Sequence, residues 1–393
     1  MNATSRAHGL DGLRGLAAAA VVLLHVWMFS GAHQPWQPDR LDTIVGSMGL
    51  AVMLFFVLSG VLIASPWVRA STPGAATPSL RRYARRRAAR IVPGYAACVL
   101  VAYVLMRAIE HPHAITASQL PAFLLFAQNQ FEATTGQLNP PLWSLSIEAT
   151  FYLAMPLIGL ALIGALRRSG TRGALVICAL LAAAGLAWNT MVFGRGEPAT
   201  LAASLPTFLP IFACGIAAAV ALQRHQTTRL ARVVLLLGGS ALVIANGWWH
   251  ADGTGWLGHV VRDLPAGVGF AMVVVAVAQG PAHLLGSAPM RRLGDYSFGV
   301  YLWHMPVIYV LRHQDRWPDS PWQAFAVVLA IAVAVGAASW YLLERPIMNW
   351  AARPQATKPD PVPTIDTDND DTASPARTAP SATNAAKVAT AHG

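Results

Sequence analysis

The sequence carries little charge. Acidic and basic residues make up 12% of its 393 residues, whereas 55% are hydrophobic and the mean hydropathy is +0.46. A soluble domain carries about a quarter of charged residues. The scarcity therefore excludes an ordinary soluble protein, and the long apolar runs indicate an integral-membrane protein.

Cysteine is also scarce. The three cysteines, Cys98, Cys178 and Cys214, lie in apolar stretches without close spacing. This excludes a disulfide framework and a cysteine zinc site, and we expect no metal. The net charge of +10 is gathered in a few segments, so it does not indicate binding to nucleic acid.

Ten apolar stretches approach the roughly 20 residues that a helix needs to cross a bilayer. They are residues 10–29, 47–66, 91–109, 143–166, 174–193, 205–222, 232–249, 263–279, 294–312 and 323–343. Helices are expected because every backbone group inside lipid needs an internal partner. The sequence therefore predicts an all-α membrane protein with about ten transmembrane helices.

The basic residues alternate between the predicted loops. With a cytoplasmic N-terminus, 22 of the 28 lysines and arginines fall in inner segments and six in outer ones. This positive-inside bias predicts cytoplasmic N- and C-termini. We expect residues 1–350 to form one transmembrane domain. Residues 351–393, rich in Pro, Thr, Ala and Asp, are expected to be a disordered cytoplasmic tail.

The first span contains two ionisable residues, Arg14 and His25. Eleven residues return to nearly the same face of a helix, about 16 Å along its axis. A charged group at the centre of a membrane helix costs about 3 kcal/mol, so such groups usually face the bundle interior and are functional. The alternatives are that Arg14 extends to the inner interface and that His25 is a hydrogen-bonded packing residue.

Two further ionisable residues are expected at the depth of His25. Glu148 lies about five residues inside the fourth span, and His304 lies about ten residues from the inner end of the ninth. A carboxylate beside an imidazole orients it and raises its basicity, as a general base requires. The sequence therefore predicts that the three residues converge, although His304 can equally be structural.

An arginine-rich segment precedes the third span. Arg87 and Arg90 are one helical turn apart, so their guanidinium groups can point the same way and bind phosphate oxygens. The alternative is that the cluster only fixes topology and attracts anionic lipid. At the other end of the chain, Glu344 to Pro346 predicts the end of the last helix, because proline stops helices.

Five sequence boxes resemble the acyltransferase-3 family of integral-membrane O-acyltransferases, over roughly residues 10 to 347. They are Arg14 with His25, "FFVLSG" at 55–60, Arg87 and Arg90 with Ile91 and Pro93, "WSLS-x-E" at 143–148, and "YS…YLWH-x-P" at 296–306. Met53 and Leu54 replace an acid often found before "FFVLSG", and Ala149 and Thr150 replace an acid and an amide. These departures concern acceptor specificity.

The resemblance implies an acyl-CoA-dependent O-acyltransferase of the bacterial plasma (inner) membrane. An acyl group, with acetyl expected, would move from cytoplasmic acyl-CoA to a hydroxyl of an envelope glycan, a glycolipid or a natural product. Acyl-CoA is then a substrate, and no bound cofactor is expected. Direct transfer and a covalent acyl-enzyme both remain open.

The resemblance also implies roles for individual residues. Arg87 and Arg90 would bind the phosphates of coenzyme A, and His25 would take the proton of the acceptor hydroxyl. Glu148 would orient or polarise an imidazole or the acceptor, and Arg14 would help to position the donor or stabilise charge along the same helix face. Candidates for the substrate pocket are His304, Trp143, Ser146 and Tyr301.

Another class of function also fits the composition. A transporter or flippase for an anionic glycolipid would use many spans, intramembrane charges and a basic inner end. The five boxes and the lack of inverted repeats favour the enzyme. A scaffold or receptor would leave the matching depths of His25 and Glu148 unexplained.

Overall fold

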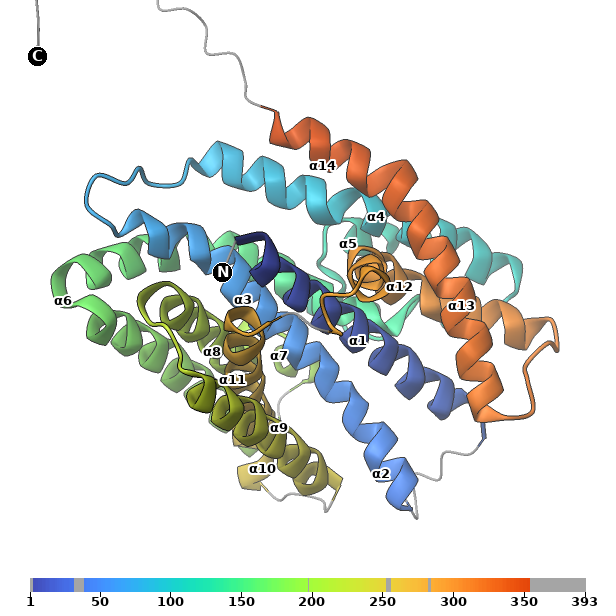
Figure 1. The fold of residues 1–393 in the computed structure, drawn as a ribbon. Helices are drawn as coiled ribbons and strands as arrows, with labels where there is room; N and C mark the ends of the chain where they lie inside the picture. The colour runs from blue at the N-terminus through green and yellow to red at the C-terminus, as the bar shows by residue number, and fades with distance from the viewer. Residues whose placement is uncertain (1–2, 32–38, 197, 252–255, 282–283, 354–393) are drawn as a thin grey trace, which may run out of the picture. The chain divides into compact units, whose positions relative to one another are not determined.

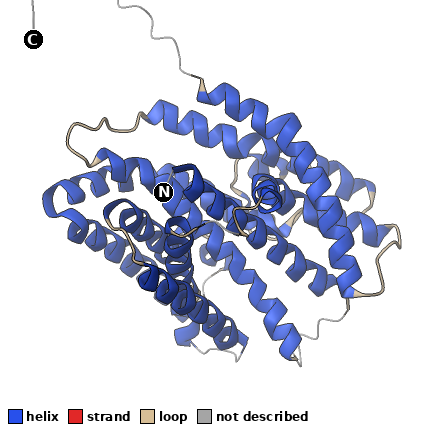
Figure 2. Ribbon diagram, in the orientation of Figure 1, coloured by secondary structure: helices blue, strands red, loops and turns tan. Residues whose placement is uncertain are grey.

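The computed structural model describes residues 3–31, 39–196, 198–251, 256–281 and 284–353. Its regular structure is helical, with no strand in these ranges (Figures 1 and 2). Its longer helices are α1 (Ala3–Phe29), α3 (Ala51–Ala70), α4 (Leu80–Ala108), α6 (Trp143–Arg195), α8 (Leu205–Arg224), α9 (Arg229–Ala251), α11 (Leu264–Gln279), α12 (Ala288–His313) and α13 (Pro321–Ser339). The shorter ones are α2 (Arg40–Gly46), α5 (Leu120–Leu124), α7 (Ala199–Ala202), α10 (Trp256–Val261), α14 (Arg345–Ala352), the 3₁₀ turns η1 (Ser47–Leu50), η2 (Gln128–Gln130) and η3 (Pro140–Leu142), and the π-helical turn η4 (Trp340–Glu344).

The all-α membrane architecture is confirmed. Within the described residues, eight helical stretches are long and apolar enough to cross a membrane. One of them, 140–195, contains both the fourth and the fifth predicted spans, and the predicted ninth span lies in α12, which is not among the eight. Most of the predicted tail, residues 354–393, lies outside the described residues.

A single glycine divides the longest helix. Gly170 in α6 has φ 60° and ψ −145°, a conformation that only glycine adopts readily. Arg167, Arg168 and Arg172 surround this break. The helix therefore separates there into the two predicted spans, in a segment too basic to lie within lipid.

Small residues set the closest helix crossings. A Cβ atom on Gly294 of α12 would lie 2.2 Å from the carbonyl oxygen of Asp11 in α1, and one on Gly60 of α3 would lie 2.8 Å from that of Phe212 in α8. Membrane helices associate through such close contacts because burial from water gives them no driving force. These crossings place α1 beside α12 and α3 beside α8.

We expect Gly60→Ala to destabilise the protein by about 1–3 kcal/mol, because the added methyl group overpacks a backbone-to-backbone contact. Gly164→Ala in α6 is the matched control, since nothing lies within 4 Å of its added Cβ atom. Unfolding in mixed micelles would measure both variants. Equal stability of the two would contradict this account of the crossing.

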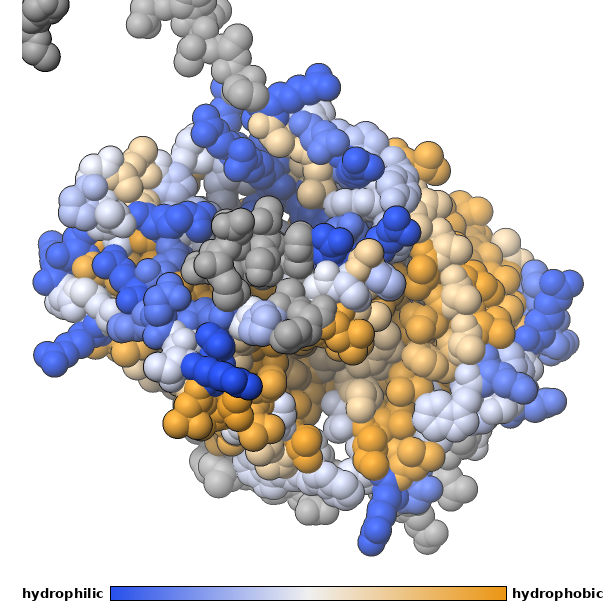
Figure 3. Space-filling view, viewed as in Figure 1, coloured by the Kyte–Doolittle hydropathy of each residue, from blue (hydrophilic) through white to orange (hydrophobic). Residues whose placement is uncertain are grey.

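The outer surfaces of the helices are apolar. Leu153 and Leu157 of α6 are 81% and 75% exposed, and Leu237 of α9 is 65% exposed. In Figure 3, hydrophobic side chains cover the surface along α13, and hydrophilic ones gather where α4 begins and α14 ends. Apolar faces of this extent suit contact with lipid.

The last helix continues past the predicted stop. The sequence predicts that Pro346 ends it, but the chain passes through η4 into α14 and stays helical to Ala352. Proline removes one hydrogen bond and clashes with the preceding turn. Here Pro346 lies in the first turn of α14, directly after a π-helical turn, where the wider backbone accommodates it.

Candidate active site

Five helices surround one large cavity, of about 760 Å³ including its open end. We call it the arginine cavity. Its ionisable residues are Arg14 (α1), Arg87 and Arg90 (α4) and Glu148 (α6), its hydroxyls are Ser59, Ser144, Tyr152, Ser297 and Tyr301, and its apolar wall is Phe55, Phe56, Leu58, Leu62, Ile63, Ile91, Leu145 and Phe298. Residues from all five sequence boxes therefore meet in one space.

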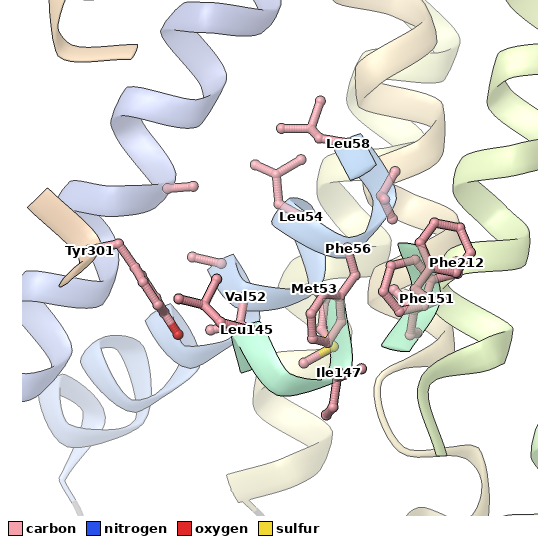
Figure 4. Close-up of a cluster of buried hydrophobic side chains, with 14 of the residues drawn as sticks. Val52, Met53, Leu54, Phe56, Leu58, Leu145, Ile147, Phe151, Phe212 and Tyr301 are labelled. Atoms are coloured by element: carbon pink, nitrogen blue, oxygen red, sulfur yellow. The ribbon is translucent and has the colours of Figure 1, made fainter. Parts of the chain in front are cut away.

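A rigid aromatic cluster supports the apolar wall. The Phe56 ring stacks on Phe212, with centroids 4.8 Å apart, and Phe151 also stacks on Phe212, at 4.0 Å. Figure 4 shows this cluster between α3, α6 and α8, with Tyr301 extending from α12 towards α3. The wall is thus supported from behind by α8, which contributes no residue to the cavity lining.

Glu148 is bonded to hydroxyls. Ser59 Oγ donates to its Oε1 at 2.5 Å, and Tyr152 Oη donates to the same oxygen at 2.7 Å. Neither His25 nor His304 is among its partners, so the structure does not place the carboxylate beside an imidazole. Two side chains at the same depth in the membrane can face different directions around the bundle. Glu148 faces α3 and the arginines and not the histidines.

The two predicted phosphate-binding arginines differ in their surroundings. Arg90 Nη1 lies 3.5 Å from Glu344 Oε2, a fully buried carboxylate, and its guanidinium lies over the rings of Phe298 and Trp340. Arg87 has no hydrogen bond or ion pair within the described residues and lies over the ring of Tyr152 at 5.8 Å. Arg87 is therefore the arginine whose charge is available to a ligand.

Arg14 is the third guanidinium of the arginine cavity. Its side chain is 21% exposed, and its Nη1 lies 3.9 Å from Asp11, one turn earlier on α1. The close crossing at Gly294 brings this part of α1 against α12. The lining carries three arginines and one carboxylate, Glu148, while Asp11 and Glu344 pair with Arg14 and Arg90 from outside it. Arg87, which has no ion pair in the described residues, is therefore the part of the cavity that suits an anion.

The two histidines form a pair. His304 Nε2 lies 3.3 Å from His25 Nδ1, and the ring centroids are 5.0 Å apart. His304 is fully buried and His25 is half-buried. Neither lines the arginine cavity. The predicted convergence is therefore divided: the histidines meet each other, and Glu148 meets the arginines.

Tyr301 lies between the two groups. Its side chain lines the arginine cavity, while its backbone carbonyl accepts from His304 Nδ1 at 2.8 Å. Its hydroxyl contacts Ser144 Oγ at 2.7 Å and donates to the Pro141 carbonyl at 2.6 Å. One residue thus joins the cavity, the histidine pair and the start of α6.

A freed carbonyl strengthens this junction. Pro306 has no N–H for the carbonyl of Leu302, four residues earlier in α12. That carbonyl accepts instead from Asn139 Nδ2, at 3.0 Å, and from Cys98 Sγ. The "YLWHMP" and "NPPLWS" segments are therefore bonded together beside the site.

Trp143 and Ser146, predicted as pocket residues, do not line the arginine cavity. Ser146 Oγ donates to the carbonyl of Phe126, and Trp143 packs on Phe56 and Phe208. Two helical residues span about 200°, so Ser146 lies opposite Ser144, which does line the cavity. The spacing of four between Ser144, Glu148 and Tyr152 was the signal that could have selected the correct face.

Comparison with known proteins agrees with this geometry. The family model described as an acyltransferase domain matches residues 7–344. The chain belongs to the acyltransferase-3 family. The residues of the arginine cavity and of the histidine pair lie inside the matched range, and every candidate span begins inside it.

Individual relatives of this acyltransferase-3 protein are distant. It is 27% identical to Nodulation protein 10 of Rhizobium leguminosarum bv. viciae, over 87% of this chain and 93% of that protein. It is 28% identical to Acyltransferase MdmB of Streptomyces mycarofaciens, over 91% and 96%. The putative peptidoglycan O-acetyltransferase YrhL of Bacillus subtilis is 23% identical over 86% of this chain, which spans 54% of YrhL. No solved structure matches significantly.

Membership and helices together assign the protein as a multi-pass membrane acyltransferase, consistent with the bacterial plasma membrane. Membership of an acyltransferase family weighs against the interpretation of the protein as a transporter or flippase. Within the described residues, no three His, Cys, Asp or Glu side chains are placed to hold a metal ion.

Proposed function

We propose that this protein transfers an acyl group, with acetyl expected, from acyl-CoA to a hydroxyl group of an envelope glycan, glycolipid or small-molecule acceptor. The observation that carries the proposal is the arginine cavity, in which Arg87, beside Arg14 and Arg90, has no hydrogen bond or ion pair within the described residues. Coenzyme A carries several phosphates, and the planar guanidinium binds phosphate oxygens through two hydrogen bonds.

The proposal gives the cavity a direction. The arginine-rich start of α4 faces the cytoplasm, where acyl-CoA is made, and this orientation follows the bias of basic residues. The thioester then extends past Arg14 and Glu148 towards Tyr301. Glu148 holds Ser59 and Tyr152 against the donor and partly balances the three guanidinium charges.

His25 is the proposed general base. It lies beyond Tyr301, on the same helix as Arg14 and eleven residues along it. The acceptor hydroxyl therefore approaches from the end of the bundle opposite to the donor. This arrangement supports direct transfer at the junction of the two paths.

Binding of CoA to the purified protein tests the donor site. We expect Arg87→Gln to weaken CoA binding about 10- to 100-fold, because it removes a charged hydrogen bond to phosphate. Binding of pantetheine, which has no phosphate, is expected to be equal in both proteins. Titration calorimetry in detergent would measure these affinities.

Arg86→Gln is the matched control, since Arg86 is exposed, adjacent and outside the arginine cavity. Unchanged CoA binding in Arg87→Gln would contradict the donor assignment.

The acceptor is identified separately, by mass spectrometry of envelope glycans, lipids and secreted metabolites from deletion and complemented strains. If no acylated species depends on the protein, the proposal fails.

A further inference from the structure

The hydrogen bonds of the two histidines determine which nitrogen of each ring carries its proton. His25 Nδ1 lies 2.8 Å from the carbonyl oxygen of Val21, and His304 Nδ1 lies 2.8 Å from that of Tyr301. A carbonyl oxygen only accepts, so both Nδ1 atoms carry hydrogen. A neutral imidazole has one N–H, so both Nε2 atoms have free lone pairs.

The contact between the rings then has one direction. His25 Nδ1 is the donor and His304 Nε2, 3.3 Å away, is the acceptor. The N–H of His25 is thus shared between Val21 and His304, and His25 Nε2 is left as the free base. We propose that His304 is the positioning residue of His25: the Val21 carbonyl fixes the tautomer, and His304 holds the ring orientation and accepts from the imidazolium that forms during acyl transfer.

This role is usually filled by a carboxylate. In Ser-His-Asp triads an aspartate holds the Nδ1–H of the catalytic histidine and stabilises its charged form. In the described part of the chain neither His25 nor His304 has a carboxylate partner, and the acid predicted beside them, Glu148, is bonded to Ser59 and Tyr152. The fully buried His304 ring takes the place of the carboxylate.

The inference rests on the proposed function, and the step balances as follows. The acceptor oxygen bonds to the thioester carbon while its proton moves to His25 Nε2. The C–S bond breaks, and the leaving sulfur of CoA takes that proton as a thiol. His25 therefore returns to its starting tautomer, with its Nδ1–H directed at His304 throughout.

Two amide substitutions separate this role from a purely structural one. The oxygen of the longer side chain in His304→Gln can occupy the place of Nε2 and accept from His25. The amide in His304→Asn reaches only the place of Nδ1, so it can keep the bond to the Tyr301 carbonyl and loses the contact with His25. A structural role predicts rescue by Asn, and a positioning role predicts rescue by Gln.

We expect His304→Asn to lower kcat about 10- to 100-fold, the effect of losing a hydrogen bond to a charged group. The KM for acyl-CoA should stay unchanged, because neither histidine lines the arginine cavity. His304→Gln should keep kcat within a few-fold of wild type. Steady-state kinetics in detergent or nanodiscs measures both constants for the variants and for wild type.

A nitrogen-15 NMR measurement keeps the test informative when a variant is poorly active, with His25→Ala to assign the signal in histidine-labelled protein. His25 Nδ1 should be protonated in wild type and in both variants, because the bond to the Val21 carbonyl remains. The Nδ1 signal should shift in His304→Asn, which loses the second acceptor, and stay close to that of wild type in His304→Gln.

Recovery by Asn with loss in Gln, or a His25 Nδ1 signal that is the same in His304→Asn as in wild type, would overturn the inference. If His25→Ala were itself fully active, the proposed general base would be wrong instead.

Discussion

Replacing His25 by alanine is expected to lower kcat about 10²- to 10⁴-fold, the usual contribution of a positioned general base. The affinity for the acyl-CoA donor should remain that of wild type, because His25 lies outside the arginine cavity and makes no contact with Arg87 or Arg90. A variant that binds donor normally but does not turn over is a specific signature. Donor binding and single-turnover kinetics on the same preparation measure it.

His313→Ala is the matched control, since His313 is exposed near the end of the same helix that carries His304. It should have wild-type activity. Two results would count against the assignment of His25. One is full activity of His25→Ala, and the other is loss of donor binding in parallel with activity, which would indicate a damaged fold.

The spans were predictable because their signal is local. Hydrophobic length predicted the helices, and the kink at Gly170 falls between the two predicted spans 143–166 and 174–193. The end of α13 was mispredicted because the effect of Pro346 depends on the width of the preceding turn. A π-helical turn has no simple sequence signal, so the helix continues where the sequence predicts a stop.

The site was predictable in depth but not in direction. Counting residues along a span places His25 and Glu148 at one layer, yet it does not say which neighbour each faces. That depends on crossings such as Gly12 and Gly294, where backbones of distant segments touch. The contact of Ser59 with Glu148 joins residues 89 apart in sequence, so no local pattern could supply it.

The periodicity within one helix did contain unused information. Tyr152 lies one turn beyond Glu148, and both line the arginine cavity with Ser144. The same reasoning rejects Ser146. The spacing of three residues between Arg87 and Arg90 suggested that both have the same role. It cannot show that a buried acid distant in sequence, Glu344, pairs with Arg90 alone.

That difference leads to the largest expected effect on stability. Arg90→Ala leaves the fully buried carboxylate of Glu344 without its charge partner, which costs about 3–5 kcal/mol. The remaining partner of Glu344 is the Ser339 hydroxyl, at 3.0 Å. Arg87→Ala removes the same charge one turn away but breaks no ion pair in the described residues, so its change is expected within about 0.5 kcal/mol. Unfolding in mixed micelles distinguishes the two.

The double variant Arg90→Met with Glu344→Gln separates the stabilising role of Arg90 from donor binding. Both members are neutral, and glutamine can still bond to Ser339, so most of the lost stability should return. Its affinity for acyl-CoA, compared with that of Arg87→Ala, then shows how much of the phosphate binding belongs to each arginine. Equal destabilisation by Arg90→Ala and Arg87→Ala would mean that the pair with Glu344 contributes nothing. In that case the only role of the small Gly94 would be to leave space for the Glu344 carboxylate, since an added Cβ atom on Gly94 would lie 3.4 Å from Glu344 Oε1.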